Sequence, residues 1–143
     1  MNLYETILVA IDLTPYSEET LKKAKVLADR LGSTLHLIHI VEPLPISAYH
    51  FMGGLDGIEN QMLEEARHKV LRQGMQFGIP ETQQYVELGT AKHGILEKAD
   101  EIKVDLIVIG SHSKKSMAHL LGSTASSVVN SASRDVIVIY TNQ

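Results

Sequence analysis

The residues with the clearest chemical potential follow a short apolar run, Leu106–Ile109, in the last third of the chain. Gly110 ends this run, and the turn at 111–116 holds two lysines, three serines and a histidine but no carboxylate, which suits an anion. The next segment, Gly122-Ser123-Thr124, is typical of a helix start, where the first backbone N–H groups have no partner within the helix. Such groups bind phosphate readily. The stretch therefore predicts a phosphate site built from a strand, a polar loop and a helix N-terminus.

Four further polar residues of this loop have two interpretations each. Lys114 or Lys115 could add positive charge to the site, and His112 or His119 could contact phosphate when protonated. The commoner role of such residues is a solvated position on the protein surface. The loop alone does not decide between the two interpretations.

Catalytic and metal-binding arrangements are not evident elsewhere. His36 and His39 are three residues apart in an expected strand, so they point to opposite faces and cannot share a metal; we expect two partly exposed strand residues. The chain has no cysteine, which excludes disulfides, thiolate metal sites and a thiol nucleophile. No nucleophile, base and acid can be assembled, so we expect a binding protein and at most a slow ATPase.

Length and composition predict one globular domain spanning residues 1–143. A net charge of −4 gives no general attraction for nucleic acid or anionic lipid, so we expect neither partner. The first residues have no basic segment typical of a secretory signal, and no apolar run approaches the length that spans a membrane. Together with the missing cysteines, this favours a cytoplasmic protein.

Strands and helices alternate along the chain. Apolar, β-branched runs predict five strands, at 6–11, 34–41, 82–88, 106–109 and 136–140. Helical spacing of apolar residues predicts four helices between them, at 17–31, 56–77, 91–102 and 123–133. This alternation indicates an α/β fold, a single-domain open parallel five-stranded sheet with helices on both faces.

Local signals mark where two of these helices begin. Ser17 is expected to be the N-cap of the first helix, and Asp56 with Glu59 resembles a capping box at the start of the second. The stretch between Glu42 and Asp56 is long for a loop inside a compact domain. It leaves the carboxyl end of a strand, so it could close over a ligand, and a solvated insertion is as consistent with it.

The chain resembles the universal stress proteins, whose ATP-binding members carry the pattern G-x2-G-x9-G-[ST] in the same strand-loop-helix position. Gly110 matches the first glycine, and Gly122 with Ser123 matches the final pair. The middle glycine is Ser113 here, and eight residues instead of nine separate it from Gly122. Family members with a shortened loop and another residue at this place look like nucleotide binders too. The resemblance covers essentially the whole chain.

This resemblance implies a strand order of 3-2-1-4-5, the Rossmann-like arrangement of the adenine nucleotide alpha hydrolases. The order reverses between the first and fourth strands, where such sheets bind their ligands. It also implies an adenine nucleotide as ligand: ATP, with AMP or another adenine nucleotide as the alternative. A Mg²⁺ ion bridging the phosphates is consistent with the preference of that ion for phosphate oxygens and water.

The resemblance implies a division of the site as well. Ala10, Ile11 and Val41 would line an apolar slot for adenine. Asp12 would accept from ribose hydroxyls, although an Asp before Thr14-Pro15 is equally typical of an Asx turn. The phosphates would lie against Gly110, which has no Cβ, and against the residues that follow it or open the next helix: Ser111, His112, Ser113, Gly122, Ser123 and Thr124.

Two functions are compatible with these features. The first is a nucleotide-binding regulatory or stress-tolerance protein, which the Gly122-Ser123 pair favours, and the second is a relative that has lost the nucleotide and acts through protein contacts. Family members commonly form homodimers by pairing their last strands, and Val136–Tyr140 matches that use, because an unpaired apolar edge promotes association. The alternative is a short, covered edge.

Overall fold

The fold is a five-stranded parallel sheet with the order β3-β2-β1-β4-β5, as the family resemblance implies. The computed structural model describes residues 2–48, 55–112 and 121–141. The strands are β1 (Thr6–Ala10), β2 (Thr34–Val41), β3 (Gln84–Leu88), β4 (Leu106–Gly110) and β5 (Asp135–Ile139). The sheet order places β1 and β4, which lie about a hundred residues apart in the chain, at its centre.

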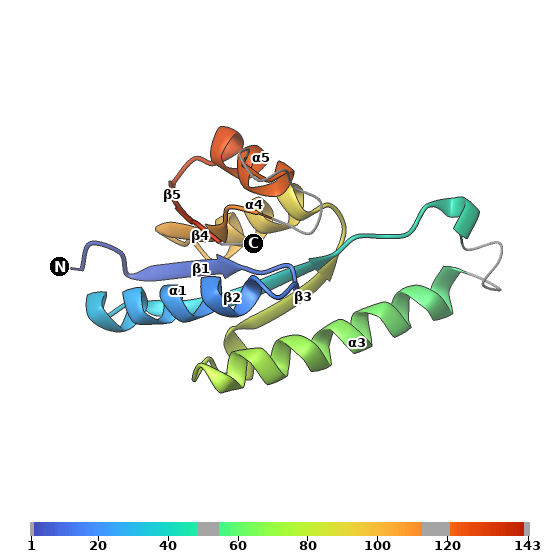
Figure 1. Ribbon diagram of the computed structural model, residues 1–143, viewed down its shortest axis with the longest axis horizontal. Coiled ribbons are helices and arrows are strands. Elements are labelled where there is room, and N and C mark those ends of the chain that lie inside the picture. Colours follow the sequence, from blue (N-terminus) through green and yellow to red (C-terminus); the bar gives the residue numbers. More distant parts are fainter. Residues whose placement is uncertain (1, 49–54, 113–120, 142–143) are drawn as a thin grey trace.

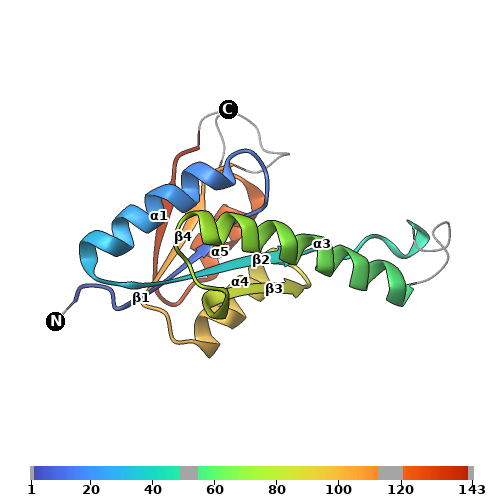
Figure 2. The ribbon, with the colours of Figure 1, turned by 90° about the horizontal axis from the view of Figure 1, so that it is seen from below.

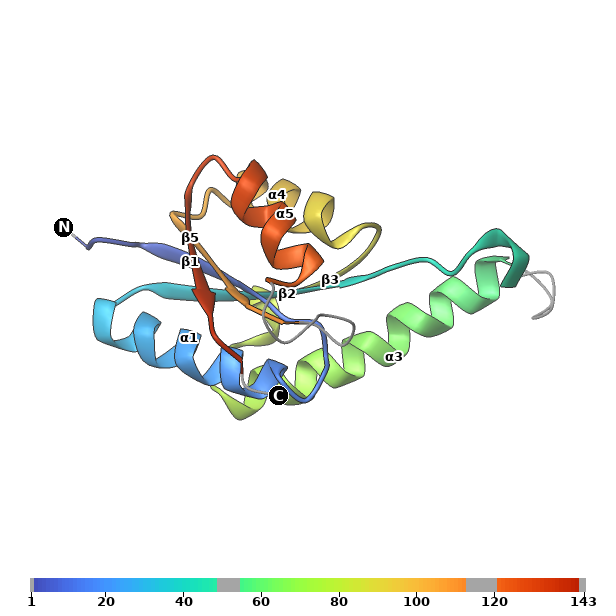
Figure 3. The same ribbon diagram turned by 45° about the horizontal axis from the view of Figure 1, so that its top comes forward.

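Helices cover both faces of this sheet (Figure 1). The four long helices are α1 (Ser17–Leu31), α3 (Leu55–Gln76), α4 (Ala91–Glu101) and α5 (Ser123–Ser131). Seen from below, α1 and α3 lie in front of the sheet (Figure 2), and α4 and α5 lie on the opposite face (Figure 3). A 3-10 turn, Glu81–Gln83, precedes β3, so β3 begins two residues later than its sequence indicates.

Alternation along β1 divides the core into two layers. Ile7 and Val9 pack with the residues of α1 and α3, whereas Leu8 and Ala10 pack with those of α4 and α5. Each of these four side chains is at most 6% exposed. Because successive side chains of a strand point to opposite faces, a strand that is buried on both sides must be apolar throughout. This requirement explains the continuous apolar runs of β1 and β4.

Two expected helix starts are wrong. Tyr16 occupies the N-cap position of α1, and Ser17 lies inside the helix with its hydroxyl donating to Asp12. Asp56 lies inside α3, which begins at Leu55, so it is not a cap. The first helix ends as expected at Gly32, whose φ of 69° is the left-handed conformation that glycine adopts most easily.

The chain after β2 forms an arm that projects beyond the sheet (Figure 1). Residues 42–45 are extended, a helical turn occupies 46–48, and α3 returns toward the sheet. Among residues 57–76, the part of α3 whose burial is described, the first buried residue is Ala66. Over the described parts of the chain, no helix is both long and apolar enough to cross a bilayer.

A buried lysine joins α4 to the edge strand β3. The side chain of Lys98 is 8% exposed, and its Nζ lies 2.9 Å from carboxylate oxygens of both Glu87 and Glu101 and 4.6 Å from the centre of the Tyr85 ring. Burial lowers the pKa of Lys98, but hydrogen bonds to the two carboxylates more than offset this and raise the pKa above its usual value. The ammonium group is therefore charged and depends on two partners.

Removing both partners should cost more than the sum of the single changes. We expect Glu87→Gln and Glu101→Gln each to lower the free energy of unfolding by about 1 kcal/mol, and the double variant to lower it by about 3 kcal/mol, because the double variant leaves a buried ammonium without a carboxylate. Urea unfolding of the four proteins measures this coupling. Adding Lys98→Met to the double variant should recover most of the loss; additive effects without such recovery would contradict this account.

Candidate functional site

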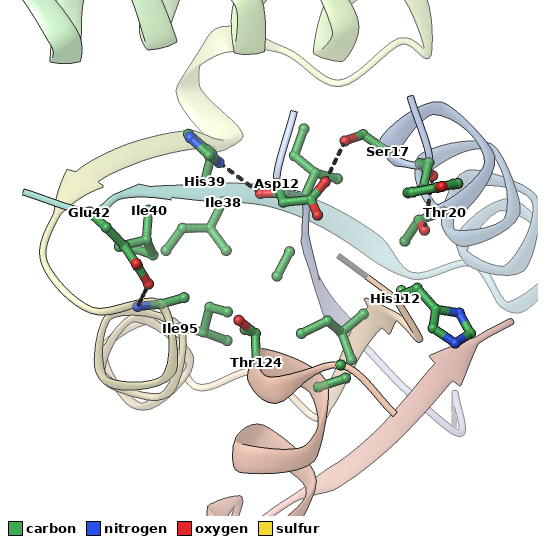
Figure 4. Close-up of a pocket in the computed structure, with 18 of the residues that line it drawn as sticks. Asp12, Ser17, Thr20, Ile38, His39, Ile40, Glu42, Ile95, His112 and Thr124 are labelled. Carbon is green, nitrogen blue, oxygen red and sulfur yellow. Dashed lines mark hydrogen bonds between the residues drawn. The ribbon is translucent and has the colours of Figure 1, made fainter. Parts of the chain in front are cut away.

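A cavity of about 690 Å³ opens at the carboxyl ends of β1, β2 and β4, where the strand order reverses (Figure 4). Its size falls in the range typical of small-molecule sites, about 300–1,000 Å³. The cavity draws on every predicted region of the site that the structure describes. Predicted site residues that line it are Ala10, Ile11, Asp12, Val41, Gly110, His112, Gly122 and Thr124.

The cavity has an apolar side and a polar side. Residues of the α4–α5 core layer line the apolar side: Ala10, Ile38, Ile40, Ile95, Ile109 and Ala125. The polar side lies around the turn after β1 and the start of α1, and includes Asp12, Tyr16, Ser17, Thr20 and His39. Such a division suits a ligand with a flat apolar part and a hydroxylated or charged part.

Asp12 has one carboxylate oxygen in the turn and one directed to no described partner. Oδ1 accepts hydrogen bonds from the Thr14 N–H at 3.0 Å, the Thr14 hydroxyl at 2.6 Å and the Ser17 hydroxyl at 3.1 Å. The Asx-turn interpretation is therefore correct. Oδ2 has no hydrogen bond to another described residue, so the carboxylate can serve the turn and still accept from a ligand.

His39 lines the cavity, a role that its sequence position did not reveal. Its Nδ1 lies 2.8 Å from the carbonyl oxygen of Ile11 and donates to it (Figure 4). Burial lowers the pKa of His39, a shift that the Ile11 carbonyl and Asp12 oppose and Lys69 reinforces, so the ring is neutral at pH 7. His36 lies on the opposite face, as expected, and contacts the Tyr85 hydroxyl at 3.1 Å.

Gly110 lines the cavity, but the space beside it serves the fold. A Cβ at this position would lie 2.9 Å from Oγ1 of Thr20 and 3.4 Å from Cγ2 of Thr141. Thr20 belongs to α1, which packs against β4. The approach of phosphate to Gly110 stays a prediction; the structure adds that the close approach of α1 also requires a residue without a side chain here.

Ser111 and His112 form a buried polar cluster with Thr141. The Ser111 hydroxyl lies 2.8 Å from Nδ1 of His112 and accepts the Thr141 N–H at 3.0 Å, and Nδ1 of His112 is 3.2 Å from the Thr141 carbonyl. His112 is 8% exposed, so a surface role for it is wrong, although the residue is part of the cavity lining. Ser111 does not line the cavity, and its hydroxyl is committed to the end of β5.

The start of α5 differs in two ways from the expectation. The N–H of Gly122 donates to the Ser111 carbonyl at 2.7 Å and is not free for a ligand. Ser123 is exposed and lies outside the cavity, whereas Thr124 lines it. The N-cap residue Gly122 offers no side chain for a capping hydrogen bond, and α5 has no acidic residue in its first turn. By the geometry of an α-helix, the N–H groups without a partner inside this helix are those of residues 123–125.

The remaining part of the predicted loop lies outside the described residues. It includes the predicted site residue Ser113 and the candidates Lys114, Lys115 and His119. The described lining contributes two carboxylates, Asp12 and Glu42, and no lysine or arginine. Sequence analysis missed Ile38 and Ile40, although a period of two places them on the same face of β2 and beside Ala10.

The fold and the cavity define an open α/β protein with a ligand-sized site at the switch point of its sheet. Residues 3–140 match the model of the universal stress protein family. Universal stress protein A homolog 2 of Coxiella burnetii is 40% identical over 142 residues, which cover 97% of each chain. The chain belongs to the universal stress protein family.

Solved structures agree with this fold. The structure of protein MJ0577 of Methanocaldococcus jannaschii matches with a TM-score of 0.82 at 23% identity and covers 99% of each chain. A universal stress protein solved in complex with cAMP matches with a TM-score of 0.64 at 22% identity, covering 97% of this chain and 98% of the other. At these identities the likeness concerns the fold.

Gly110→Ala should destabilise the protein through Thr20. We expect a loss of about 2 kcal/mol in the free energy of unfolding, because the new methyl group forces Thr20 to move in a packed interior. Adding Thr20→Ala should recover most of this loss, since it removes the atom that the methyl group meets. Urea unfolding measures both changes.

Gly57→Ala is a matched control for this experiment. Its Cβ would meet no atom within 4 Å, so we expect no loss of stability. A Gly110→Ala protein as stable as the wild type would show that this contact relaxes without cost. A destabilised one that Thr20→Ala does not rescue would show that the loss does not come from Thr20.

Proposed function

We propose that the protein binds an adenine nucleotide, with ATP the first candidate, and acts as a regulatory or stress-tolerance protein of the cytoplasm. The observation that carries the proposal is the cavity at the switch point, whose apolar side meets the open start of α5. An adenine ring suits the apolar side and a phosphate suits the helix start. The solved cAMP complex of a structural neighbour is consistent with this ligand class.

The three helix starts at the cavity support one orientation of the ligand. Asp12 accepts from the Ser17 hydroxyl at the start of α1, and Glu42 lies 3.5 Å from the Ala91 N–H at the start of α4. Carboxylates therefore already occupy two of the positive helix ends. Only α5, among these three, has neither an acidic residue in its first turn nor a described carboxylate bound to it. We therefore place the phosphates at α5 and the nucleoside near Asp12.

The charge of the cavity supports a role for magnesium. Asp12 and Glu42 would repel a bare polyphosphate, and the described lining supplies no lysine or arginine to balance it. A Mg²⁺ ion held by phosphate oxygens and water would reduce this repulsion without a dedicated protein cage. We propose that ATP binds as its magnesium complex.

Titration calorimetry with ATP and MgCl₂ tests the proposal. We expect binding to the wild-type protein, about tenfold weaker binding to Thr124→Val, which removes a hydroxyl from the cavity wall, and weaker binding when EDTA replaces magnesium. Ser123→Ala is the matched control, because this neighbouring hydroxyl is exposed and outside the cavity; its affinity should stay within about twofold.

Titrations with AMP and cAMP then identify the preferred phosphate group. Absence of heat with all three nucleotides, together with no nucleotide released from the denatured protein, would contradict the proposal. That result would favour the alternative of a family member that acts through protein contacts alone.

We propose in addition that two copies pair through β5. β5 is an edge strand of the sheet. In a parallel strand, the N–H and C=O of one residue point to the same side, and those of the next residue point to the opposite side. Because the Ile139 carbonyl accepts from Ser111 N–H at 2.8 Å, the backbone groups of Val136 and Val138 point outward. The expected dimer strand was Val136–Tyr140, but β5 ends at Ile139 and Tyr140 is 65% exposed beyond it.

Sedimentation at micromolar concentration should show a dimer for the wild-type chain. Val138→Pro should shift it to monomer, since proline removes an outward N–H and leaves the pairing with β4 in place. Circular dichroism checks that this variant remains folded. A monomeric wild-type protein would exclude the dimer.

A further inference from the structure

The inference concerns His39 and rests on the proposed function. We propose that His39 is a positioning residue that, through the backbone of Ile11, places the Asp12 carboxylate for recognition of the ribose hydroxyls. His39 itself need not touch the nucleotide. Its role would be to set the point at which the chain leaves β1 and enters the turn that carries Asp12.

Both backbone polar groups of Ile11 are held by β2. The N–H of Ile11 donates to the Ile38 carbonyl at 3.0 Å, and the Ile11 carbonyl accepts from Nδ1 of His39 at 2.8 Å. β1 itself ends at Ala10. The side chain of His39 therefore adds one hydrogen bond between β2 and the chain beyond the end of β1. This bond fixes the carbonyl group of the peptide bond that joins Ile11 to Asp12.

The turn beyond Ile11 needs this support, because the chain changes direction sharply. Leu13 has a φ of 61°, a left-handed conformation that is rare for a leucine. On the far side of that residue, the Thr14 N–H and hydroxyl hold Oδ1 of Asp12. On the near side, before Asp12, the His39 ring donates to the Ile11 carbonyl. The carboxylate is thus restrained from both ends, with Oδ2 left toward the cavity.

Other roles for His39 agree less well with its surroundings. No group of three metal-ligating side chains occurs among the described residues. Nδ1 is occupied as a donor to a backbone carbonyl, and burial keeps the ring neutral by lowering its pKa. Figure 4 shows that this nitrogen faces the turn at Asp12 and that the second ring nitrogen lies on the other side of the ring. The His39 ring therefore binds the backbone of Ile11 and is not a phosphate ligand.

A pair of variants separates positioning from packing. Asn places its amide nitrogen where His carries Nδ1, so His39→Asn keeps a donor for the Ile11 carbonyl. His39→Leu fills similar space without a donor. Thermal unfolding measures the stability of each variant, and calorimetry measures its affinity for ATP and for 2′,3′-dideoxy-ATP, which lacks both ribose hydroxyls.

We expect the wild-type protein and His39→Asn to prefer ATP over the dideoxy compound by about tenfold or more, the value of one well-placed hydrogen bond to a charged group. His39→Leu should lose most of this preference while its affinity for the dideoxy compound stays within about threefold. In an Asp12→Ala background, His39→Leu should have no further effect on the preference, because the group that it positions is gone.

The outcomes distinguish the two levels of the proposal. A His39→Leu protein that keeps the wild-type preference, whatever its melting temperature, overturns the role of His39 and leaves nucleotide binding intact. A wild-type protein that binds both compounds equally overturns the role of His39 as well, because Asp12 then does not recognise the ribose hydroxyls. A wild-type protein that binds neither compound overturns the proposed function itself, and the role of His39 with it.

Discussion

The parallel pairing of β1 with β4 is the constraint on which the rest of the structure depends. Ala10 lies opposite Ile109 in this pair, so the residues that follow the two strands emerge side by side although they are about a hundred positions apart. The chain then leaves β1 toward α1 on one face and β4 toward α5 on the other. A gap must open between the diverging segments, and the cavity occupies it.

The same geometry concentrates helix N-termini at one edge of the sheet, which has an electrostatic cost. Positive helix ends attract any nearby anion, including carboxylates of the protein. Asp12 and Glu42 lie at two of these helix ends, so the cavity is acidic beside the starts of α1 and α4. Among the described residues, no carboxylate lies at the start of α5, which leaves that helix end as the place where the proposed anion would bind.

Local patterns located the five strands and the four long helices, and the family resemblance supplied residues of the cavity wall. Ala10 and Val41 lie at strand ends, and strand ends can be located from apolar runs, so their place in the cavity was predictable. The packing of Gly110 was not predictable, because its neighbour Thr20 comes from a helix ninety residues earlier. The bonds of Ser111 were not predictable for the same reason, since its hydroxyl is bound by Thr141, thirty residues further on.

Histidines show most clearly what the sequence could not decide. His36 and His39 occupy one strand, yet one contacts Tyr85 of β3 and the other the end of β1. The spacing of three predicted opposite faces but contained no information about which neighbour each face meets. His112 has a polar sequence context and is nevertheless buried, because the end of β5 covers it. Contacts between distant segments decide such roles.

Ser111 joins three parts of the molecule at a single residue. Its N–H donates to Ile139, its carbonyl accepts from Gly122, and its hydroxyl accepts from Thr141. Loss of any one of these bonds would expose buried polar groups of the others, so the three should break as one cooperative unit. Ile139 and Thr141 are therefore linked through Ser111 to Gly122, and a disturbance at these two residues would be transmitted directly to the start of α5.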